Sequence, residues 1–182
     1  MVIYLSPGDY HRFHSPAIHT AKYRRHIAGY LFPVKPSYVE KDKDVFKNNE
    51  RVNIFGNWRD NDFFFCSYVG ALNVGSIVLD FDEDVVTNEA KPVSPYYYDK
   101  SYLKGMTSPI SSTHDKSEEH NDGLINFTKG QMEGRFEMGS TIVLIYETPK
   151  NSTEVLAAEG DKLVMGQPLI RTKPSSQNEM AE

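Results

Sequence analysis

The segment 63–81, FFFCSYVGALNVGSIVLDF, is the most apolar stretch of the chain and the one that most restricts its fold. Its two glycine-bearing steps, Val69-Gly70 and Val74-Gly75, suit strands with closely approaching backbones rather than one long helix. Helical periodicity is scarce elsewhere, whereas apolar and polar residues often alternate, as they do in Arg51–Phe55. The sequence therefore predicts a mainly β protein.

Three further elements are predicted from local patterns. The segments Val2–Leu5 and Thr141–Tyr146 are expected to be strands, and the polar segment Asp42–Asn49 contains one short helix. The segment 111–122, SSTHDKSEEHND, has the composition of a polar loop. Helices are thus expected to be few and short.

Two segments resemble each other: 123–136 (GLINFTKGQMEGRF) and 160–170 (GDKLVMGQPLI). Each places an extended apolar stretch before a Gly-Gln turn. Such turns between short strands are typical of barrel-sandwich folds, although two ordinary β-turns would give the same pattern. We predict a mainly β, barrel-sandwich-like catalytic domain over residues 1–172, with a flexible tail at 173–182.

Composition excludes several classes of protein. Acidic residues outnumber basic ones by 25 to 20, for a net charge of −5, which argues against a nucleic-acid partner. The single cysteine, Cys66, can form no internal disulfide, and we expect it to be an inert buried thiol. No cluster of cysteine and histidine suggests a metal site. No apolar run approaches the roughly 18 residues of a membrane-spanning helix.

The first constellation of reactive side chains lies in YLSPGDYHRFHSP, residues 4–16. It contains Asp9, His11 and His14 within six positions. Histidine is the natural proton shuttle near neutral pH. In a strand, the spacing of His11 and His14 places the two rings on opposite faces, whereas in a turn they could converge. A structural role for such a pair remains an alternative.

The second constellation is Gly139-Ser140, directly before the predicted strand at 141–146. A serine hydroxyl there can attack the preceding carbonyl in an N-to-O acyl shift. Elimination of the ester then leaves dehydroalanine, which hydrolyses to a pyruvoyl group and ammonia. This chemistry needs a strained bond, a base and a polar pocket for the oxyanion. A tight turn entering a strand is the simpler reading of Gly-Ser alone.

Together the motifs resemble those of the pyruvoyl-dependent phosphatidylserine decarboxylases. That family's signatures include YLSPxDYHRxHxP and GxFxxGST, which correspond here to YLSPGDYHRFHSP and GRFEMGST. The chain also has NERV (49–52), VGALNVGSI (69–77) and GQPL (166–169) in the family's order. The family's usual LGST is Met138-Gly139-Ser140-Thr141 here, which keeps the Gly-Ser step. The resemblance extends from Ile3 to Ile170.

The resemblance implies a role for each matched residue. Cleavage between Gly139 and Ser140 would yield a β chain, 1–139, and an α chain, 140–182, with a pyruvoyl group in place of Ser140. His14 corresponds to the base that activates the serine, and His11 to a residue of decarboxylation, as proton donor. The pyruvoyl group would act as the electron sink for converting phosphatidylserine to phosphatidylethanolamine, the role that pyridoxal phosphate has elsewhere.

The resemblance also implies partners and a location. The α and β chains stay associated, the family often forms homo-oligomers, and the substrate lies in membranes, at the mitochondrial inner membrane or an endomembrane. The basic segment Lys22–His26 could hold the lipid head group, with a solvated basic loop as the alternative.

One family feature is absent from the sequence. The aspartate that orients the processing histidine lies well upstream of YLSP in the family, and loss of such a residue costs a protease triad about 10⁴ in rate. Asp9 lies within the histidine motif and does not match it. We therefore expect a fragment of a longer protein, with a divergent member that self-processes weakly as the alternative. An unprocessed, non-catalytic remnant or lipid-binding module on the same scaffold is the alternative function.

Overall fold

The computed structural model describes residues 1–59, 61–72, 76–89, 97–103 and 123–173. The chain divides into two compact units, Met1–Tyr146 and Glu147–Glu182. The elements are β1 (Val2–Tyr4), β2 (Arg12–His14), β3 (His19–Ile27), α1 (Pro36–Val39), α2 (Val45–Asn48), β4 (Arg51–Trp58), β5 (Asp62–Val69), β6 (Ile77–Leu79), β7 (Tyr97–Ser101), β8 (Ile125–Phe127), β9 (Met132–Phe136), β10 (Thr141–Tyr146), β11 (Thr153–Val155) and β12 (Ile170–Thr172). The prediction of a mainly β protein with a few short helices is confirmed.

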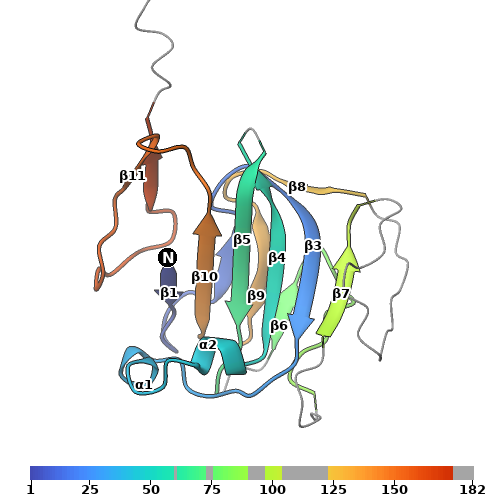
Figure 1. The fold of residues 1–182 in the computed structure, drawn as a ribbon. Coiled ribbons are helices and arrows are strands. Elements are labelled where there is room, and N and C mark those ends of the chain that lie inside the picture. Colours follow the sequence, from blue (N-terminus) through green and yellow to red (C-terminus); the bar gives the residue numbers. More distant parts are fainter. Residues whose placement is uncertain (60, 73–75, 90–96, 104–122, 174–182) are drawn as a thin grey trace, which may run out of the picture. The chain divides into compact units, whose positions relative to one another are not determined.

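Seven strands of the first unit form one antiparallel sheet, here called the main sheet. Its order is β1-β10-β5-β4-β3-β7, and β8 pairs with β3 (Figure 1). Strand β10 therefore lies between β1 and β5, with Thr141 opposite both Tyr4 and Val69. Aromatic and β-branched residues favour these long central strands because they pack well on a pleated surface.

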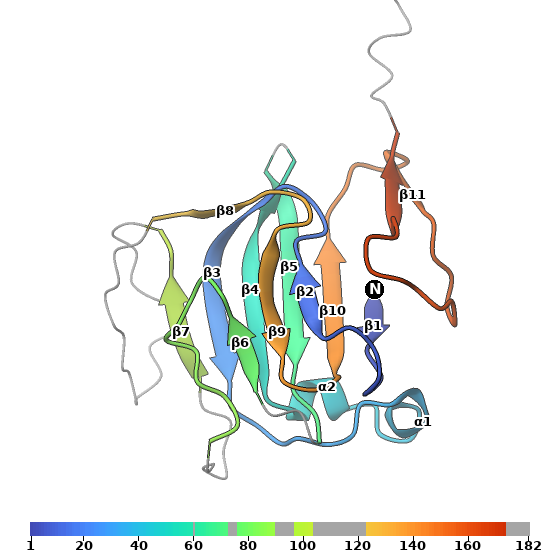
Figure 2. The ribbon, with the colours of Figure 1, turned by 180° about the vertical axis from the view of Figure 1, so that it is seen from behind.

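A second, three-stranded sheet with the order β2-β9-β6 covers one face of the main sheet (Figure 2). Phe13 of β2 stacks on Tyr68 of β5, with ring centroids 3.8 Å apart, and meets Phe136 of β9 edge-on. All three side chains are buried. Aromatic pairs in such contacts add to the stability gained by burying their area. The core thus lies between the two sheets.

The predicted elements agree well with the observed ones. The strand at Thr141–Tyr146 is confirmed with the same bounds, and the strand at 51–55 continues to Trp58 as β4. The helix predicted within 42–49 is the single turn α2. Helix α1 starts at Pro36, where a missing backbone N–H costs nothing. The loop predicted at 111–122 lies outside the described residues.

The two Gly-Gln turns have the same construction. Gly130 and Gly166 have positive φ, 82° and 84°, a conformation that favours glycine. In one turn Thr128 N–H donates to the Gln131 side chain, and in the other Val164 N–H donates to that of Gln167. The internal similarity of the sequence therefore corresponds to a repeated turn.

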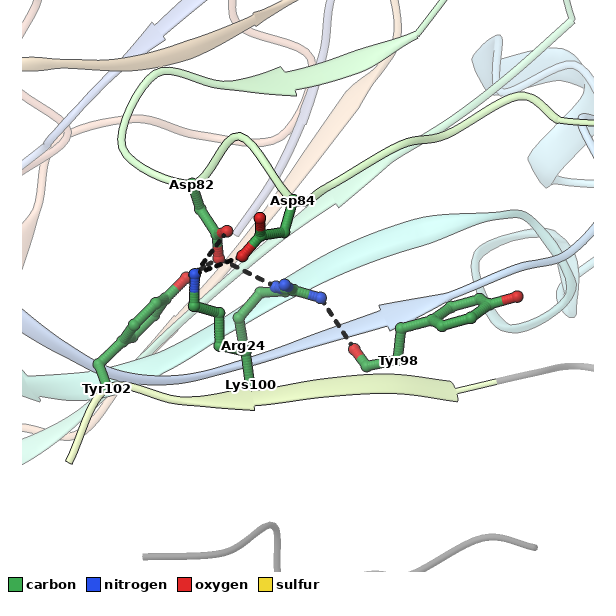
Figure 3. A network of polar contacts seen from close by, with 6 residues as sticks. All are labelled: Arg24, Asp82, Asp84, Tyr98, Lys100 and Tyr102. Carbon is green, nitrogen blue, oxygen red and sulfur yellow. Dashed lines mark hydrogen bonds and ion pairs between the residues drawn. The ribbon is translucent and has the colours of Figure 1, made fainter. Parts of the chain in front are cut away.

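The basic segment at 22–26 is not a loop. It lies in β3, where Arg24 is buried, and Arg24 Nε contacts the Asp82 carboxylate at 3.2 Å (Figure 3). Arg25 binds both oxygens of Asp99 at 2.8 Å. His26 is buried with its Nε2 2.9 Å from Glu50. Arg24, Arg25 and His26 thus bind acidic partners within the protein, which argues against the lipid-binding hypothesis, whereas Lys22 contacts the Asn61 side chain at 3.3 Å. The alternative of a solvated loop is wrong, because the segment is a strand.

Asp82 collects further partners and forms what we call the Asp82 cluster, with Arg24, Lys100 and Tyr102 (Figure 3). Lys100 Nζ lies 3.1 Å from one Asp82 oxygen, and the Tyr102 hydroxyl donates to the other at 2.5 Å. Burial opposes ionisation of Asp82, but Arg24, Tyr102 and Lys100 together lower its pKa. The cluster ties the turn after β6 to β3 and β7.

Candidate functional site

The Gly139–Ser140 peptide lies between β9 and β10, at the end of the main sheet where β5 finishes. Ser140 is fully buried. Its carbonyl accepts a hydrogen bond from Leu5 N–H at 2.7 Å, and its hydroxyl donates to the Val69 carbonyl. The bond predicted to cleave is therefore held by backbone on both sides, from the chain after β1 and from the end of β5.

Gly139 packs directly against the chain that follows β1. A Cβ atom at Gly139 would lie 2.6 Å from the Leu5 carbonyl oxygen and 2.8 Å from that of Ser6. Real Cβ atoms essentially never come that close to backbone oxygens. The position thus requires glycine for space, and the absence of a side chain lets the Leu5-Ser6 backbone close against the bond.

Asn49 supports the other side of the site, and sequence reasoning did not single it out. Its amide donates to the carbonyls of Gly70 and Phe32, both at 2.8 Å, and accepts from Phe32 N–H at 3.0 Å. The Gly70 carbonyl belongs to the peptide that directly follows Val69-Gly70, so Asn49 holds the chain one peptide beyond the Val69 oxygen that accepts from the Ser140 hydroxyl. Asn49 is the first residue of the NERV segment, which was quoted only as part of the resemblance.

Thr141 follows Ser140 and is also fully buried. Its hydroxyl has no hydrogen-bond partner among the described residues. A buried hydroxyl without a partner is costly, and such groups are often found where a reacting group completes the site. Thr141 is thus a donor available beside the bond.

His14 is held by two partners. One ring nitrogen, Nδ1, lies 2.9 Å from the Gly130 carbonyl, and the other, Nε2, lies 2.8 Å from the Tyr10 hydroxyl. A carbonyl can only accept, so the proton of the neutral ring is assigned to Nδ1 and Nε2 carries the lone pair. The imidazole is therefore oriented with its basic nitrogen toward a hydroxyl, that of Tyr10.

His11 has a different environment. Its Nε2 lies 3.1 Å from the Pro7 carbonyl, which assigns the proton to that nitrogen. Its Nδ1 is buried and has no partner among the described residues. The two histidines of the motif therefore do not converge on one partner.

The structure does not bring His14 into hydrogen-bond contact with Ser140. The serine hydroxyl bonds Val69, and both His14 nitrogens bond other groups. His14 is half-buried rather than enclosed in the core. The expected contact between them within the core is therefore absent among the described residues of this uncleaved chain.

The sequence analysis did not identify a second buried cluster of ionisable and polar side chains, here called the Glu133 cluster. It consists of Glu133, His19, Tyr68 and Ser15. Tyr68 donates to Glu133 Oε2 at 2.6 Å, while Glu133 Oε1 lies 3.7 Å from His19 Nε2. Burial raises the pKa of Glu133 to about 7 and lowers that of His19, which stacks between Phe64 and Phe127, to about 4. Both groups are thus largely neutral near pH 6.

Cys66 lies in the same interior. It is buried, and burial raises the pKa of its thiol. The thiolate is the reactive form, so this environment suppresses reactivity. The prediction of a buried thiol is confirmed.

Nowhere in the described residues do three or more histidine, cysteine or acidic side chains gather as metal ligands would. Across the same residues, no helix has the length and apolarity needed to cross a bilayer.

Comparison with known proteins gives a consistent result. The model of the family "Phosphatidylserine decarboxylase" matches residues 1–171. The mitochondrial phosphatidylserine decarboxylase proenzyme of Rattus norvegicus is 44% identical over 168 residues, which are 92% of this chain and 37% of the relative. Proenzyme 1 of Schizosaccharomyces pombe is 40% identical over 175 residues, 96% of this chain and 37% of the relative. Proenzyme 1 of Arabidopsis thaliana is 37% identical over 183 residues, 94% of this chain and 37% of the relative.

The chain thus spans somewhat more than a third of the length of these relatives. The matched range, residues 1–171, contains His11, His14 and the Gly139-Ser140 step. The chain belongs to the phosphatidylserine decarboxylase family.

Proposed function

We propose that this chain is the catalytic part of an enzyme that decarboxylates phosphatidylserine to phosphatidylethanolamine, using a pyruvoyl group made by its own cleavage at Gly139-Ser140. The observation that carries the proposal is the clamped Gly139–Ser140 bond, buried between the Leu5-Ser6 backbone and Val69 in a member of this family. The proposed catalytic domain covers residues 1–172.

The self-cleavage starts at the Ser140 hydroxyl. Its oxygen attacks the Gly139 carbonyl carbon, the C–N bond breaks, and an ester joins Gly139 to the Ser140 side chain. Elimination then releases the Gly139 carboxylate and leaves dehydroalanine at 140. Water converts that residue to a pyruvoyl group and releases ammonia. Val69 orients the attacking oxygen through the hydrogen bond that it accepts from the hydroxyl.

His14 is the proposed base for this attack. The Gly130 carbonyl holds its Nδ1 proton and leaves Nε2 as the acceptor, the arrangement that a triad carboxylate provides in serine proteases. Since Nε2 now accepts from Tyr10, the ring or Tyr10 must move before it reaches Ser140. Catalytic hydrogen bonds are often long or unformed before the reacting complex assembles.

The surroundings of residue 140 suit a pyruvoyl group. The site is buried, and Thr141 offers an uncommitted hydroxyl donor. When formed, the group supplies an electron sink for loss of carbon dioxide from a substrate that bears an amine. His11, with its proton on Nε2 and a buried Nδ1, is the proposed proton donor to the product.

The cellular setting is proposed from the relatives, whose names include "mitochondrial". We assign the protein to a membrane that contains phosphatidylserine, the mitochondrial inner membrane or an endomembrane. Its proposed partners are its own α and β chains, and the resemblance adds a homo-oligomer to the proposal.

Intact mass analysis tests the proposal directly. The complete gene product should give a fragment that begins at residue 140 and carries a pyruvoyl N-terminus, reactive toward hydrazine reagents. Ser140→Ala should stay uncleaved, and Ser152→Ala, which alters an exposed turn hydroxyl, should cleave normally. A wild-type protein that remains whole, with an ordinary serine at 140, would contradict the proposal.

The second candidate is a non-catalytic remnant or lipid-binding module. It is favoured by the absent contact between His14 and Ser140. Such a protein would sediment with phosphatidylserine vesicles but release no carbon dioxide from carboxyl-labelled phosphatidylserine. Release of labelled carbon dioxide that depends on Ser140 excludes it.

A further inference from the structure

We propose that Asp9 is a positioning residue for the Gly139–Ser140 bond, because its carboxylate fixes the turn whose backbone closes against Gly139. The inference rests on the proposed self-cleavage and names a residue to which neither the sequence motif nor the comparisons assign a role. It concerns the turn Ser6-Pro7-Gly8-Asp9, here called the Asp9 turn.

The turn is closed by three hydrogen bonds between its two ends. Asp9 Oδ2 accepts from Ser6 N–H at 2.7 Å and from the Ser6 hydroxyl at 2.8 Å. Asp9 N–H donates to the Ser6 carbonyl at 2.9 Å. The carboxylate therefore determines where the Ser6 backbone lies.

That backbone is one wall of the site. The Ser6 carbonyl oxygen, which accepts from Asp9, is one of the two oxygens that would meet a Cβ at Gly139. The neighbouring Leu5 supplies the other oxygen, and its N–H holds the Ser140 carbonyl. Movement of Ser6 is thus transmitted to both residues of the scissile bond.

The same turn also holds a histidine. Pro7 lies inside the turn, and its carbonyl accepts from His11 Nε2 at 3.1 Å. A loosened turn would release the His11 ring as well as the wall against Gly139. Asp9 therefore couples the position of the bond to the position of one proposed catalytic ring.

The geometry argues for positioning rather than for a triad role. Asp9 Oδ2 bonds Ser6, and the Nδ1 proton of His14 goes to Gly130. Both Ser6 bonds reach the same oxygen, so the amide oxygen of asparagine can accept both. Asp9→Asn should therefore preserve the turn, whereas Asp9→Ala should not.

The first arm of the test measures cleavage in the complete gene product. Asp9→Ala should slow the appearance of the fragment that begins at residue 140 by about 100-fold, the size expected when reacting groups are displaced by roughly 1 Å. Asp9→Asn should remain within a few-fold of wild type. The matched control is Asp161→Ala, because Asp161 closes a turn with the Ala158 N–H in the same way at 2.8 Å, in the second unit.

The second arm measures hydrogen exchange in a Ser140→Ala background, where cleavage cannot occur. Asp9→Ala should speed exchange of the Leu5 and Ser6 amides at least tenfold, while Asp9→Asn leaves them protected. Thermal melting of each variant separates this local change from general unfolding.

The outcomes are separable. Cleavage of Asp9→Ala at the wild-type rate, or unchanged exchange at Leu5 and Ser6, overturns the inference. Asp9→Asn as slow as Asp9→Ala overturns it too, because the charge rather than the turn would then matter. An uncleaved wild-type protein contradicts the proposed function, and the exchange arm still decides whether Asp9 holds this wall.

Discussion

The two buried clusters of ionisable groups differ in how they reduce the free-energy cost of burying a charge. In the Asp82 cluster, Arg24, Lys100 and Tyr102 surround one carboxylate and lower its pKa, so Asp82 stays charged. Asp84, 2.7 Å from Lys100, supplies the second negative charge beside the two cations. In the Glu133 cluster, burial raises the pKa of the acid to about 7 and lowers that of His19 to about 4, so the charges are suppressed.

The difference follows from the donors within reach. The Asp82 carboxylate faces two cations, whereas Glu133 faces one tyrosine hydroxyl and a histidine at 3.7 Å among stacked rings. Because the described contacts of Glu133 include no permanent cation, the cost of desolvating a charge dominates, and the neutral forms of Glu133 and His19 are favoured. The first cluster should therefore be sensitive to loss of a partner and the second to pH.

The largest expected effect is loss of the Asp82 charge. Asp82→Asn leaves the buried Arg24 without its carboxylate partner, while Lys100 keeps Asp84 at 2.7 Å, and should cost about 3 kcal/mol of the free energy of unfolding. Urea denaturation at pH 7 measures it. The control is Asp80→Asn, which alters a partly exposed pair with Arg135 at 3.7 Å and should cost no more than about 1 kcal/mol. Equal losses of stability in both variants would show that the Asp82 cluster contributes no more than a partly exposed ion pair.

The next effect has the opposite sign. The pKa of Glu133 is raised from 4.5 to about 7 in the folded protein. Its contribution to the free energy of unfolding is therefore fully present below pH 4.5 and is lost as pH rises through 7. Glu133→Gln removes this loss and should stabilise the protein by about 3 kcal/mol at pH 8. Glu137→Gln, at an exposed position, should change little. Destabilisation by Glu133→Gln at pH 8 would refute a suppressed charge.

A smaller effect is expected in the pH profile of the wild type. The folded pKa of His19 is depressed from 6.5 to about 4, so its contribution is present above pH 6.5 and is lost as pH falls through 4. As pH falls from 6.5 to 4.5, the contribution of Glu133 to the free energy of unfolding grows. The two changes in stability, from His19 and from Glu133, should therefore nearly cancel. The free energy of unfolding, measured by denaturation at a series of pH values, should therefore be almost constant between pH 4.5 and 6.5 in the wild type. In Glu133→Gln it should decrease toward acid pH. The same slope in both proteins would contradict the compensation.

The smallest effect concerns an uncharged group. Thr141→Val replaces the buried hydroxyl that has no partner among the described residues and should stabilise the protein by about 1 kcal/mol. Thr87→Val is the matched contrast, because Thr87 accepts from Ile77 N–H at 2.8 Å and its loss should destabilise by a similar amount. Calorimetry distinguishes the two signs. Destabilisation by Thr141→Val would indicate a partner for that hydroxyl.

Sequence patterns predicted the local strands but not these clusters, and cleavage at Gly139-Ser140 stays a prediction. Alternation identified β4 and β10 because strand periodicity is a local property. Arg24 and Asp82 are 58 residues apart, and Tyr68 and Glu133 are 65 apart, so their pairing depends on sheet topology. For that reason the sequence alone predicts an exposed basic segment at 22–26, where the structure has a partly buried strand. The separation of His14 from Ser140 was hidden for the same reason.

The place of β10 in the main sheet determines what a broken 139–140 bond would do to the molecule. The downstream piece would begin with an interior strand, bonded along one edge to β1 and along the other to β5, both of which belong to the upstream piece. Two backbone ladders would then keep a nicked protein together as a noncovalent complex. The pieces should co-purify in native buffer and separate only in denaturant.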